Sequence, residues 1–265
     1  MRVIGFTRPD KSSNVLVIGG LIQDIEVKGS GHLSEVSCKP GGSGHNVASV
    51  LSIFGHSVYF VSVAPFDLVR HMKHFSYSFI PVSRCSREGR VLYREDLSVI
   101  GVQRPHHEGV SERLFDVLAE SVFDLLYVTL ELDNPLLELA CSVDRSIAVI
   151  DIKPSFRISE AMQYIGSYDV IIANQEEQRQ LGEFNSRRLV RMRAENGVAF
   201  RGKEYAFEQS DRNKLKCGDL LGATISNELL CGKNLTEAVV TATSVASDYA
   251  RKPHTLEEYT ACLPR

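Results

Sequence analysis

The stretch KPGGSGHNVASVLSIFG, residues 39–55, places three glycines directly before a pattern of apolar residues at helical spacing. The glycines are Gly41, Gly42 and Gly44, and the apolar pattern extends to Phe54. Glycine weakens a helix and costs backbone entropy, so a cluster at a helix start indicates that the backbone passes very close to another group. A neighbouring strand and a bound ligand are the two candidates for that group.

The composition of the chain narrows its class and its partners. The 265 residues are 43% hydrophobic, which is enough for a sizeable core. A formal net charge of -3 gives no basic surface for nucleic acid, and no run of like charge suggests a membrane-surface arm. The N-terminal stretch is too polar for a signal peptide, and no apolar run reaches the roughly 18 residues of a spanning helix. We therefore expect a cytoplasmic protein with a small-molecule partner, and neither nucleic acid nor membrane.

The cysteines and histidines do not indicate a metal site. Six cysteines are scattered without a C-x-x-C pair, which argues against a zinc site and against a compact disulfide framework. Free thiols in a reducing compartment are the simplest interpretation. The pair His106-His107 is interpreted as a solvated turn, because the sequence indicates no third metal ligand nearby.

Short apolar runs alternate with helical patterns along the first two thirds of the chain. The runs are residues 15–20, 58–63, 125–130, 147–152 and 170–173, and the helical patterns are residues 46–54, 112–122, 134–142 and 159–165. Apolar runs of this length are typical of parallel strands that are buried on both faces. The alternation predicts right-handed crossovers and a parallel sheet with helices on both faces.

The last third of the chain has a different pattern. Residues 197–207 alternate around Gly202, which predicts a β-hairpin. Two helical patterns follow at residues 219–231 and 235–250.

Two internal segments do not fit the parallel sheet. Residues 24–38 and 87–103 alternate apolar and polar positions, as half-exposed antiparallel strands do. We interpret them as a small β lid over one edge of a single domain that comprises residues 1–265.

Polar residues follow several of the apolar runs. Ligands of open α/β sheets bind at the carboxyl ends of the strands, so these residues are candidates for a ligand site. They are Asp24, Asp151, Lys153, Asn174 and Glu177.

A second glycine feature is the stretch KCGDLLGA, residues 216–223, which leads into a helical pattern. Taken alone, Asp219 is most simply an N-cap, since Asp is among the preferred caps. The helix start can also be an anion site, because free N–H groups and the positive helix end receive phosphate oxygens. Asp219 would then lie beside a transferable phosphate.

Five motifs occur in the order that one known family shows. They are VIGGLIQD, GGSGHNVASVLSIFG, IDIKPSFR, NQEE and CGDLLGA, and their order and spacing agree with that family over roughly residues 14–250. Together they resemble the ribokinase-like (pfkB) carbohydrate and nucleoside kinases, whose signatures are G-G-x-x-x-N-x-A and G-A-G-D. The resemblance implies the fold of that family, an α/β three-layer sandwich with a central, mostly parallel sheet and a small β lid.

The resemblance also implies an activity. It implies an ATP-dependent kinase that transfers the γ-phosphate to a hydroxyl of a sugar or nucleoside, with ATP and Mg²⁺ as cofactors. A ribosyl compound is the favoured acceptor, and pseudouridine is one candidate. Asp219 would be the general base, the amides of Cys217, Gly218 and Asp219 would form the anion hole, and Lys216 would lie along the phosphates.

The acceptor side is implied by the N-terminal motifs. The residues that would bind the sugar hydroxyls are Asp24, Gly41, Gly42 and Asn46. His45 lies among them, and the sequence leaves open whether it lines the pocket or is simply exposed.

The nucleotide side is implied by the later motifs. Asn174 and Glu177 would organise Mg²⁺ through water, and Arg193 and Gly197 fall at the expected nucleotide loop. The basic run that contains Arg193 is otherwise typical of a solvated face.

Three stretches depart from the family pattern. Lys216 and Cys217 stand where the family has glycine and alanine, residues 64–68 lack two expected glycines, and residues 192–197 keep only Gly197. A second hypothesis follows: the chain is a catalytically degenerate module of the same fold, which binds a sugar or nucleotide without turnover and acts as a regulatory module. A homodimer through the lid is also left open.

Overall fold

The computed structural model contains two sheets. It describes residues 5–29, 34–64, 77–87, 90–94, 99–103, 106–107, 114, 118, 120–131, 134–153, 158–182, 184, 186–193, 196–207, 216–252 and 254–263. The large sheet has ten strands in the order β14-β13-β12-β11-β10-β9-β1-β4-β5-β8. In chain order they are β1 (Asn14–Ile18), β4 (Ser57–Ala64), β5 (Ser78–Arg87), β8 (His106–His107), β9 (Val122–Thr129), β10 (Asp144–Asp151), β11 (Val170–Asn174), β12 (Leu189–Met192), β13 (Val198–Phe200) and β14 (Lys203–Tyr205).

The pairing in the large sheet is mostly parallel. All neighbours from β12 through β11, β10, β9, β1 and β4 to β5 run parallel. The antiparallel pairs lie at the two edges, β12-β13-β14 on one side and β5-β8 on the other. The predicted parallel sheet and the predicted hairpin of residues 197–207 are therefore confirmed.

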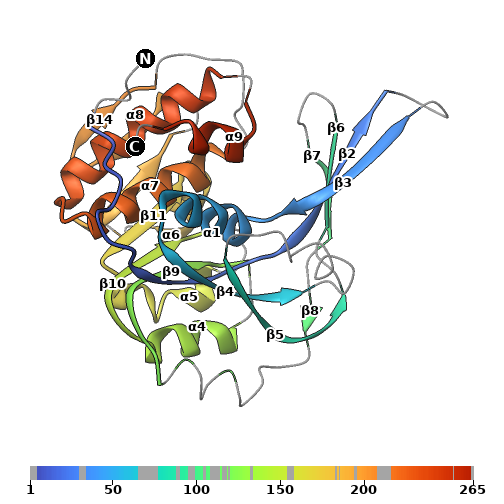
Figure 1. The fold of residues 1–265 in the computed structure, drawn as a ribbon, viewed down its shortest axis with the longest axis horizontal. Helices are drawn as coiled ribbons and strands as arrows, with labels where there is room; N and C mark the ends of the chain where they lie inside the picture. Colours follow the sequence, from blue (N-terminus) through green and yellow to red (C-terminus); the bar gives the residue numbers. More distant parts are fainter. Residues whose placement is uncertain are drawn as a thin grey trace.

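Helices cover both faces of this sheet (Figure 1). They are α1 (Ser43–Phe54), α4 (Asn134–Ser142), α5 (Ile158–Ala161), α6 (Gln175–Leu181), α7 (Cys217–Leu230), α8 (Leu235–Ala250) and α9 (Leu256–Ala261), with a 3₁₀ turn η4 (Ile165–Ser167). Strand β1 shows why the runs are apolar throughout: Val15 and Val17 pack into the cluster with α1, α7, α8 and α9, and Leu16 and Ile18 into the cluster with α4, α5 and α6. The predicted three-layer α/β sandwich is confirmed.

The second sheet is the lid. It contains β2 (Ile22–Lys28), β3 (Glu35–Gly41), β6 (Arg90–Arg94) and β7 (Val99–Gln103) in the order β3-β2-β6-β7. It projects from the body of the molecule, and β3 leads directly into α1 (Figure 1).

Three expectations about these segments are corrected. The lid is not purely antiparallel: β2-β3 and β6-β7 are antiparallel hairpins, but the hairpins join through β2 and β6, which run parallel. Arg87 belongs to β5 of the large sheet rather than to the lid. His106 and His107 form β8 instead of a solvated turn, because β5 offers them antiparallel backbone pairing.

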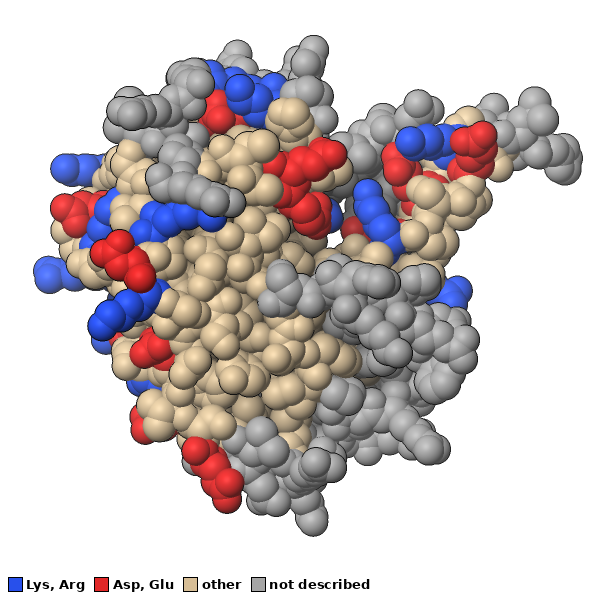
Figure 2. Space-filling model, in the orientation of Figure 1, with Lys and Arg blue, Asp and Glu red and all other residues tan. Residues whose placement is uncertain are grey.

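Other expectations concern the surface and the remaining helices. Most of the helix expected at residues 112–122 lies outside the described residues. On the face in Figure 2 the described Lys and Arg residues are interspersed with Asp and Glu. Within the described part of the chain, no helix combines the length and the apolar character needed to cross a membrane.

Candidate functional site

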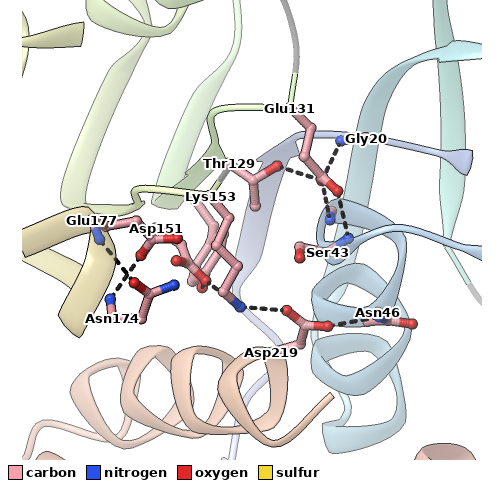
Figure 3. Close-up of polar contacts among 12 residues, drawn as sticks. Gly20, Ser43, Asn46, Thr129, Glu131, Asp151, Lys153, Asn174, Glu177 and Asp219 are labelled. Carbon is pink, nitrogen blue, oxygen red and sulfur yellow. Dashed lines mark hydrogen bonds and ion pairs between the residues drawn. The ribbon is translucent and has the colours of Figure 1, made fainter. Parts of the chain in front are cut away.

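The candidate site lies where the carboxyl ends of parallel strands face the start of two helices. Strands β1, β9, β10 and β11 end there, and α1 and α7 begin there (Figure 3). This is the position at which open α/β sheets bind ligands.

Asp219 is a buried carboxylate in the first turn of α7. Asn46 Nδ2 of α1 donates a hydrogen bond to Oδ2 at 2.7 Å, and Lys153 Nζ donates to Oδ1 at 2.9 Å (Figure 3). Burial alone would raise the pKa of Asp219, but the charge of Lys153 and hydrogen bonds from Lys153, Asn46 and Ser43 lower it below its ordinary value. Asp219 is therefore ionised at neutral pH.

Lys153 follows β10 and joins two carboxylates. Its Nζ lies 3.1 Å from Asp151 Oδ2 and 2.9 Å from Asp219 Oδ1. Burial would lower the pKa of Lys153, but Asp151 and Asp219 raise it above its ordinary value, so the ammonium stays charged. Burial raises the pKa of Asp151 to about 6, even though Lys153 opposes that shift. The Tyr127 hydroxyl also donates to Asp151 Oδ2, at 3.4 Å.

The backbone at the start of α7 lies very close to the Lys153 side chain. A Cβ on Gly218 would lie 2.8 Å from Lys153 Nζ, so the ammonium packs against the first turn of the helix. Burial raises the pKa of Cys217 to about 12, and the thiol therefore stays protonated. That the Cys217 amide contributes to an anion hole stays a prediction.

Lys216 is the N-cap of α7 and has φ 68 and ψ -2, in the left-handed region. The family signature has glycine at this position, and glycine adopts this conformation without a steric cost. Burial, and then the charge of Lys216, lower the pKa of His45 to about 3, so Lys216 lies near the start of α1. His45 itself is buried, with Nδ1 2.7 Å from the Tyr77 hydroxyl, which rules out simple exposure.

The backbone at Lys216 gives a stability prediction. Lys216→Gly should be more stable than Lys216→Ala by about 1 kcal/mol, because only the alanine keeps the left-handed strain of a Cβ. Urea unfolding of both variants measures the difference. Lys203 in strand β14 is the matched control, since glycine should be the less stable of the two replacements there. Equal stability of the two Lys216 variants would show that the conformation is not strained.

The glycines at the start of α1 meet the protein's own backbone. Gly42 has φ 98, and a Cβ there would lie 2.5 Å from Gly20 O. A Cβ on Gly44 would lie 2.6 Å from the carbonyl carbon of Gly19. The close neighbour that the glycine cluster indicates is therefore the segment after β1, and this packing places the start of α1 at the sheet.

The same packing gathers the expected acceptor-binding residues. A Cβ on Gly41 would lie 2.2 Å from an Asp24 carboxyl atom, so this buried carboxylate rests against the glycine backbone. Asn46 donates its backbone N–H to Gly42 O at 3.0 Å and its side-chain amide to Asp219. The contacts thus run from Asp24 in the lid to Asp219 in α7.

Glu131 was not anticipated from the sequence. Its Oε2 accepts hydrogen bonds from the amides of Gly20 and Gly44 at 2.9 and 3.1 Å and from Thr129 Oγ1 at 2.9 Å (Figure 3). Its Oε1 accepts from the Ser43 amide at 3.0 Å. Burial raises the pKa of Glu131, although the amides of Ser43 and Gly44 oppose the shift. Through these hydrogen bonds Glu131 connects the carboxyl ends of β1 and β9 to the N-terminus of α1, where a negative charge is favourable.

Asn174 and Glu177 form a capping box at the start of α6. Glu177 N donates to Asn174 Oδ1 at 2.9 Å, and Asn174 N donates to Glu177 Oε2 at 2.7 Å. Burial, and then the neighbouring Asp151, raise the pKa of Glu177 to about 7. A capping role accounts for the geometry, but a buried carboxyl with so high a pKa is also typical of a functional site.

The raised pKa of Glu177 predicts a pH dependence of stability. Between its ordinary pKa of 4.5 and about 7, the folded state holds a proton that the unfolded state has lost, so the unfolding free energy falls as pH rises. Glu177→Gln should therefore reduce the decrease in Tm between about pH 5 and pH 8. The exposed neighbour Glu176 supplies the control, because Glu176→Gln should keep the wild-type decrease. If Tm fell equally with pH in wild type and in Glu177→Gln, the raised pKa of Glu177 would be contradicted.

Arg193 and Gly197 are held within the edge hairpin. Arg193 forms an ion pair with Glu204 and donates its backbone N–H to Gly197 O at 2.8 Å. Gly197 has φ 97, and a Cβ there would lie 2.1 Å from Tyr205 O. Both residues have a structural explanation, and their contact with a nucleotide stays a prediction.

Comparison with known proteins gives one family. The profile of the pfkB family carbohydrate kinases matches residues 12–200. Ribokinase from Thermotoga maritima has a TM-score of 0.73 and 19% identity, over 94% of this chain and 98% of that one. No curated protein sequence matches this chain.

Two further solved structures have the same fold. Adenosine kinase from Sinorhizobium meliloti has a TM-score of 0.65 and 17% identity, over 94% of this chain and 98% of that one. Ribokinase from Cryptococcus neoformans var. grubii in complex with ADP has a TM-score of 0.68 and 15% identity, over 93% and 96% of the two chains. At these identities the likeness concerns the fold.

Proposed function

Because the chain belongs to the pfkB family of carbohydrate kinases, we propose that it transfers the γ-phosphate of ATP to a hydroxyl of a sugar or nucleoside. A ribosyl compound is the favoured acceptor. The solved structures with the same fold include ribokinases and an adenosine kinase, which supports this choice.

One observation carries the proposal, the position of Asp219. Its carboxylate lies in the first turn of α7, where N–H groups without helical partners and the helix dipole favour a phosphate. An acceptor hydroxyl beside Asp219 would give its proton to the carboxylate as the oxygen attacks phosphorus. The amides of Cys217, Gly218 and Asp219 would meet the negative charge of the transferred group.

The acceptor side offers buried polar atoms for hydroxyl groups. Asn46 Oδ1 is buried and has no hydrogen-bond partner among the described residues, while its Nδ2 donates to Asp219. A buried amide oxygen is expected to accept a hydrogen bond, and a sugar hydroxyl would supply one. The buried Asp24 carboxylate would accept hydrogen bonds from further hydroxyls.

The residues present fit a hydrated Mg²⁺ on the nucleotide side. Asp151 Oδ1 is fully buried and has no hydrogen-bond partner among the described residues. The Glu177 carboxyl lies close enough for the charge of Asp151 to raise its pKa. Carboxylate oxygens suit Mg²⁺, which usually keeps several waters and binds through few protein ligands. Within the described residues no three His, Cys, Asp or Glu side chains gather into a metal cluster. When bound, the ion would offset charge on the phosphates.

A second candidate function has one observation in its favour. Lys153 Nζ packs against Gly218 and pairs with Asp219, so the protein's own cation occupies the start of α7. In a module that binds a sugar or nucleotide without phosphoryl transfer, Lys153 would stay paired with Asp219 and no phosphate would replace it at the start of α7.

A thermal-shift screen of nucleosides and pentoses, with and without ATP and Mg²⁺, tests the proposal. A ligand at 100 times its Kd adds about 2.7 kcal/mol, which for a chain of this length raises Tm by roughly 5 to 10 °C. Compounds that raise Tm are then assayed for phosphorylation. Binding without transfer would favour the second candidate, and no shift with any nucleotide or acceptor would overturn both.

A further inference from the structure

The charged cluster at the start of α7 contains a cation to which the family signatures assign no role. The ammonium of Lys153 lies between the carboxylates of Asp151 and Asp219 (Figure 3). It also packs against the backbone of Gly218. In the sequence, Lys153 is one of the polar residues that follow the apolar runs.

The contacts of Lys153 leave it able to reach a ligand. An ammonium has three N–H donors, and the two carboxylates take two of them. The Lys153 side chain is 22% exposed, so the charged cluster is partly accessible to solvent at Lys153. The first turn of α7, against which Nζ packs, is the place where amides without helical acceptors and the helix dipole favour phosphate. A phosphoryl group at those amides would lie beside the ammonium.

We propose that Lys153 is a further catalytic residue, whose ammonium contacts the transferred phosphoryl group at the start of α7 and offsets its negative charge. The inference rests on the proposed kinase function. In the step, the bond between the γ-phosphorus and the β,γ-bridging oxygen breaks, and a bond from the acceptor oxygen to phosphorus forms. The hydroxyl proton goes to Asp219, and Lys153 keeps its proton throughout.

The alternative role is that Lys153 only neutralises Asp151. The chain offers a charge-matched test, because Asp151→Asn combined with Lys153→Met removes one negative and one positive charge. The net charge of the three positions 151, 153 and 219 then equals that of wild type. Because Asp151 is also a candidate Mg²⁺ ligand, Asp151→Asn alone is the reference for the double variant. Removing a neutralising lysine from Asp151→Asn would cause no further loss, whereas removing a phosphate-binding lysine would.

The experiment compares wild type, Asp151→Asn, Lys153→Met and the double variant by calorimetry with AMP-PNP and with ADP, both with Mg²⁺. Lys153→Met should weaken AMP-PNP binding by about 10- to 100-fold, the range of a hydrogen bond to a charged group, and leave ADP affinity nearly unchanged. With ATP and an acceptor from the screen, kcat should fall by about 10²- to 10³-fold. Relative to Asp151→Asn, the double variant should show the same losses.

A lysine at the other end of the same helix is the matched control. Lys233 pairs with the buried Glu228, and its side chain is 24% exposed, close to the 22% of Lys153. Lys233→Met should lower Tm without changing kcat or AMP-PNP affinity. This separates loss of a buried ion pair from loss of a phosphate contact.

The outcomes distinguish this inference from the proposed function. A double variant with the same kcat and AMP-PNP affinity as Asp151→Asn would show that Lys153 only neutralises Asp151, and this would overturn the inference. Equal losses for ADP and AMP-PNP would place its contact away from the transferred group. If wild type transfers phosphate and Lys153→Met equals it, only this inference fails. If wild type neither binds AMP-PNP nor transfers phosphate, the proposed function fails and this inference with it.

Discussion

Asp219→Asn is expected to lower kcat by about 10²- to 10⁴-fold, the usual contribution of a general base, while acceptor affinity stays close to that of wild type. The asparagine matches the carboxylate in shape, so the Asn46 side chain keeps a neighbour of the same size. Lys153 keeps its contact with Asp151, so the variant leaves no unpaired ammonium. What the variant loses is the atom that accepts the hydroxyl proton.

A second carboxylate on the same helix provides the control for this result. Glu228 lies near the end of α7, is fully buried and accepts a hydrogen bond from the Thr7 amide at 2.9 Å. Glu228→Gln should lower stability and leave kcat unchanged. Near wild-type turnover in Asp219→Asn, measured by steady-state phosphorylation, would remove Asp219 from the mechanism.

The second large effect concerns folding. Gly44→Ala should lower the free energy of unfolding by roughly 3 kcal/mol, because a Cβ there would lie 2.6 Å from the Gly19 carbonyl carbon and 2.8 Å from Gly20 N. Both neighbours are backbone atoms, which cannot rotate away as a side chain can. Any movement of α1 that relieves the clash also lengthens the hydrogen bonds from the Gly44 and Ser43 amides to Glu131.

Gly166 is the matched control for Gly44. A Cβ on Gly166 meets no described atom within 4 Å, and its φ lies outside the left-handed region. Gly166→Ala should therefore change stability by no more than about 0.5 kcal/mol. Urea unfolding measures both variants. If Gly44→Ala matched Gly166→Ala, the packing of α1 against the segment after β1 would be looser than the structure indicates.

The core of the fold is predictable because its strands are buried on both faces. The side chains of Val15, Leu16 and Val17 are fully buried, so the strand reads as an unbroken apolar run. Helices α7 and α8 have helical spacing, and α8 has its own capping box at Asn234 and Glu237. Local sequence is sufficient for elements of this kind.

Elements that depend on distant partners were not predictable. Strand β5 contains Pro81, Arg84 and Arg87, and no alternation marks it. The parallel pairing of β2 with β6 brings together two hairpins that are far apart in the chain, and a local pattern shows only the hairpins. Helix α9 has six residues, which is too short for a clear apolar period.

The residues of the candidate site likewise include some that the sequence indicates and some that only the structure shows. The motifs indicated Asn46 and Asp219 as site residues, and the structure places these two side chains in contact across 173 positions of sequence. Glu131 was missed because its main partners are backbone amides, which carry no sequence signature. The available signal was its place just after β9, equivalent to that of Lys153 after β10. The pairing of Lys153 with Asp219 is tertiary and is visible only in the structure.

The most direct measurement is mass spectrometry of each acceptor that raises Tm, after incubation with the protein, ATP and Mg²⁺. The proposed function predicts an acceptor heavier by one phosphoryl group and a matching amount of ADP, formed by wild type and far more slowly by Asp219→Asn. Acceptors that bind but leave wild type unmodified, with no ADP formed, would contradict it.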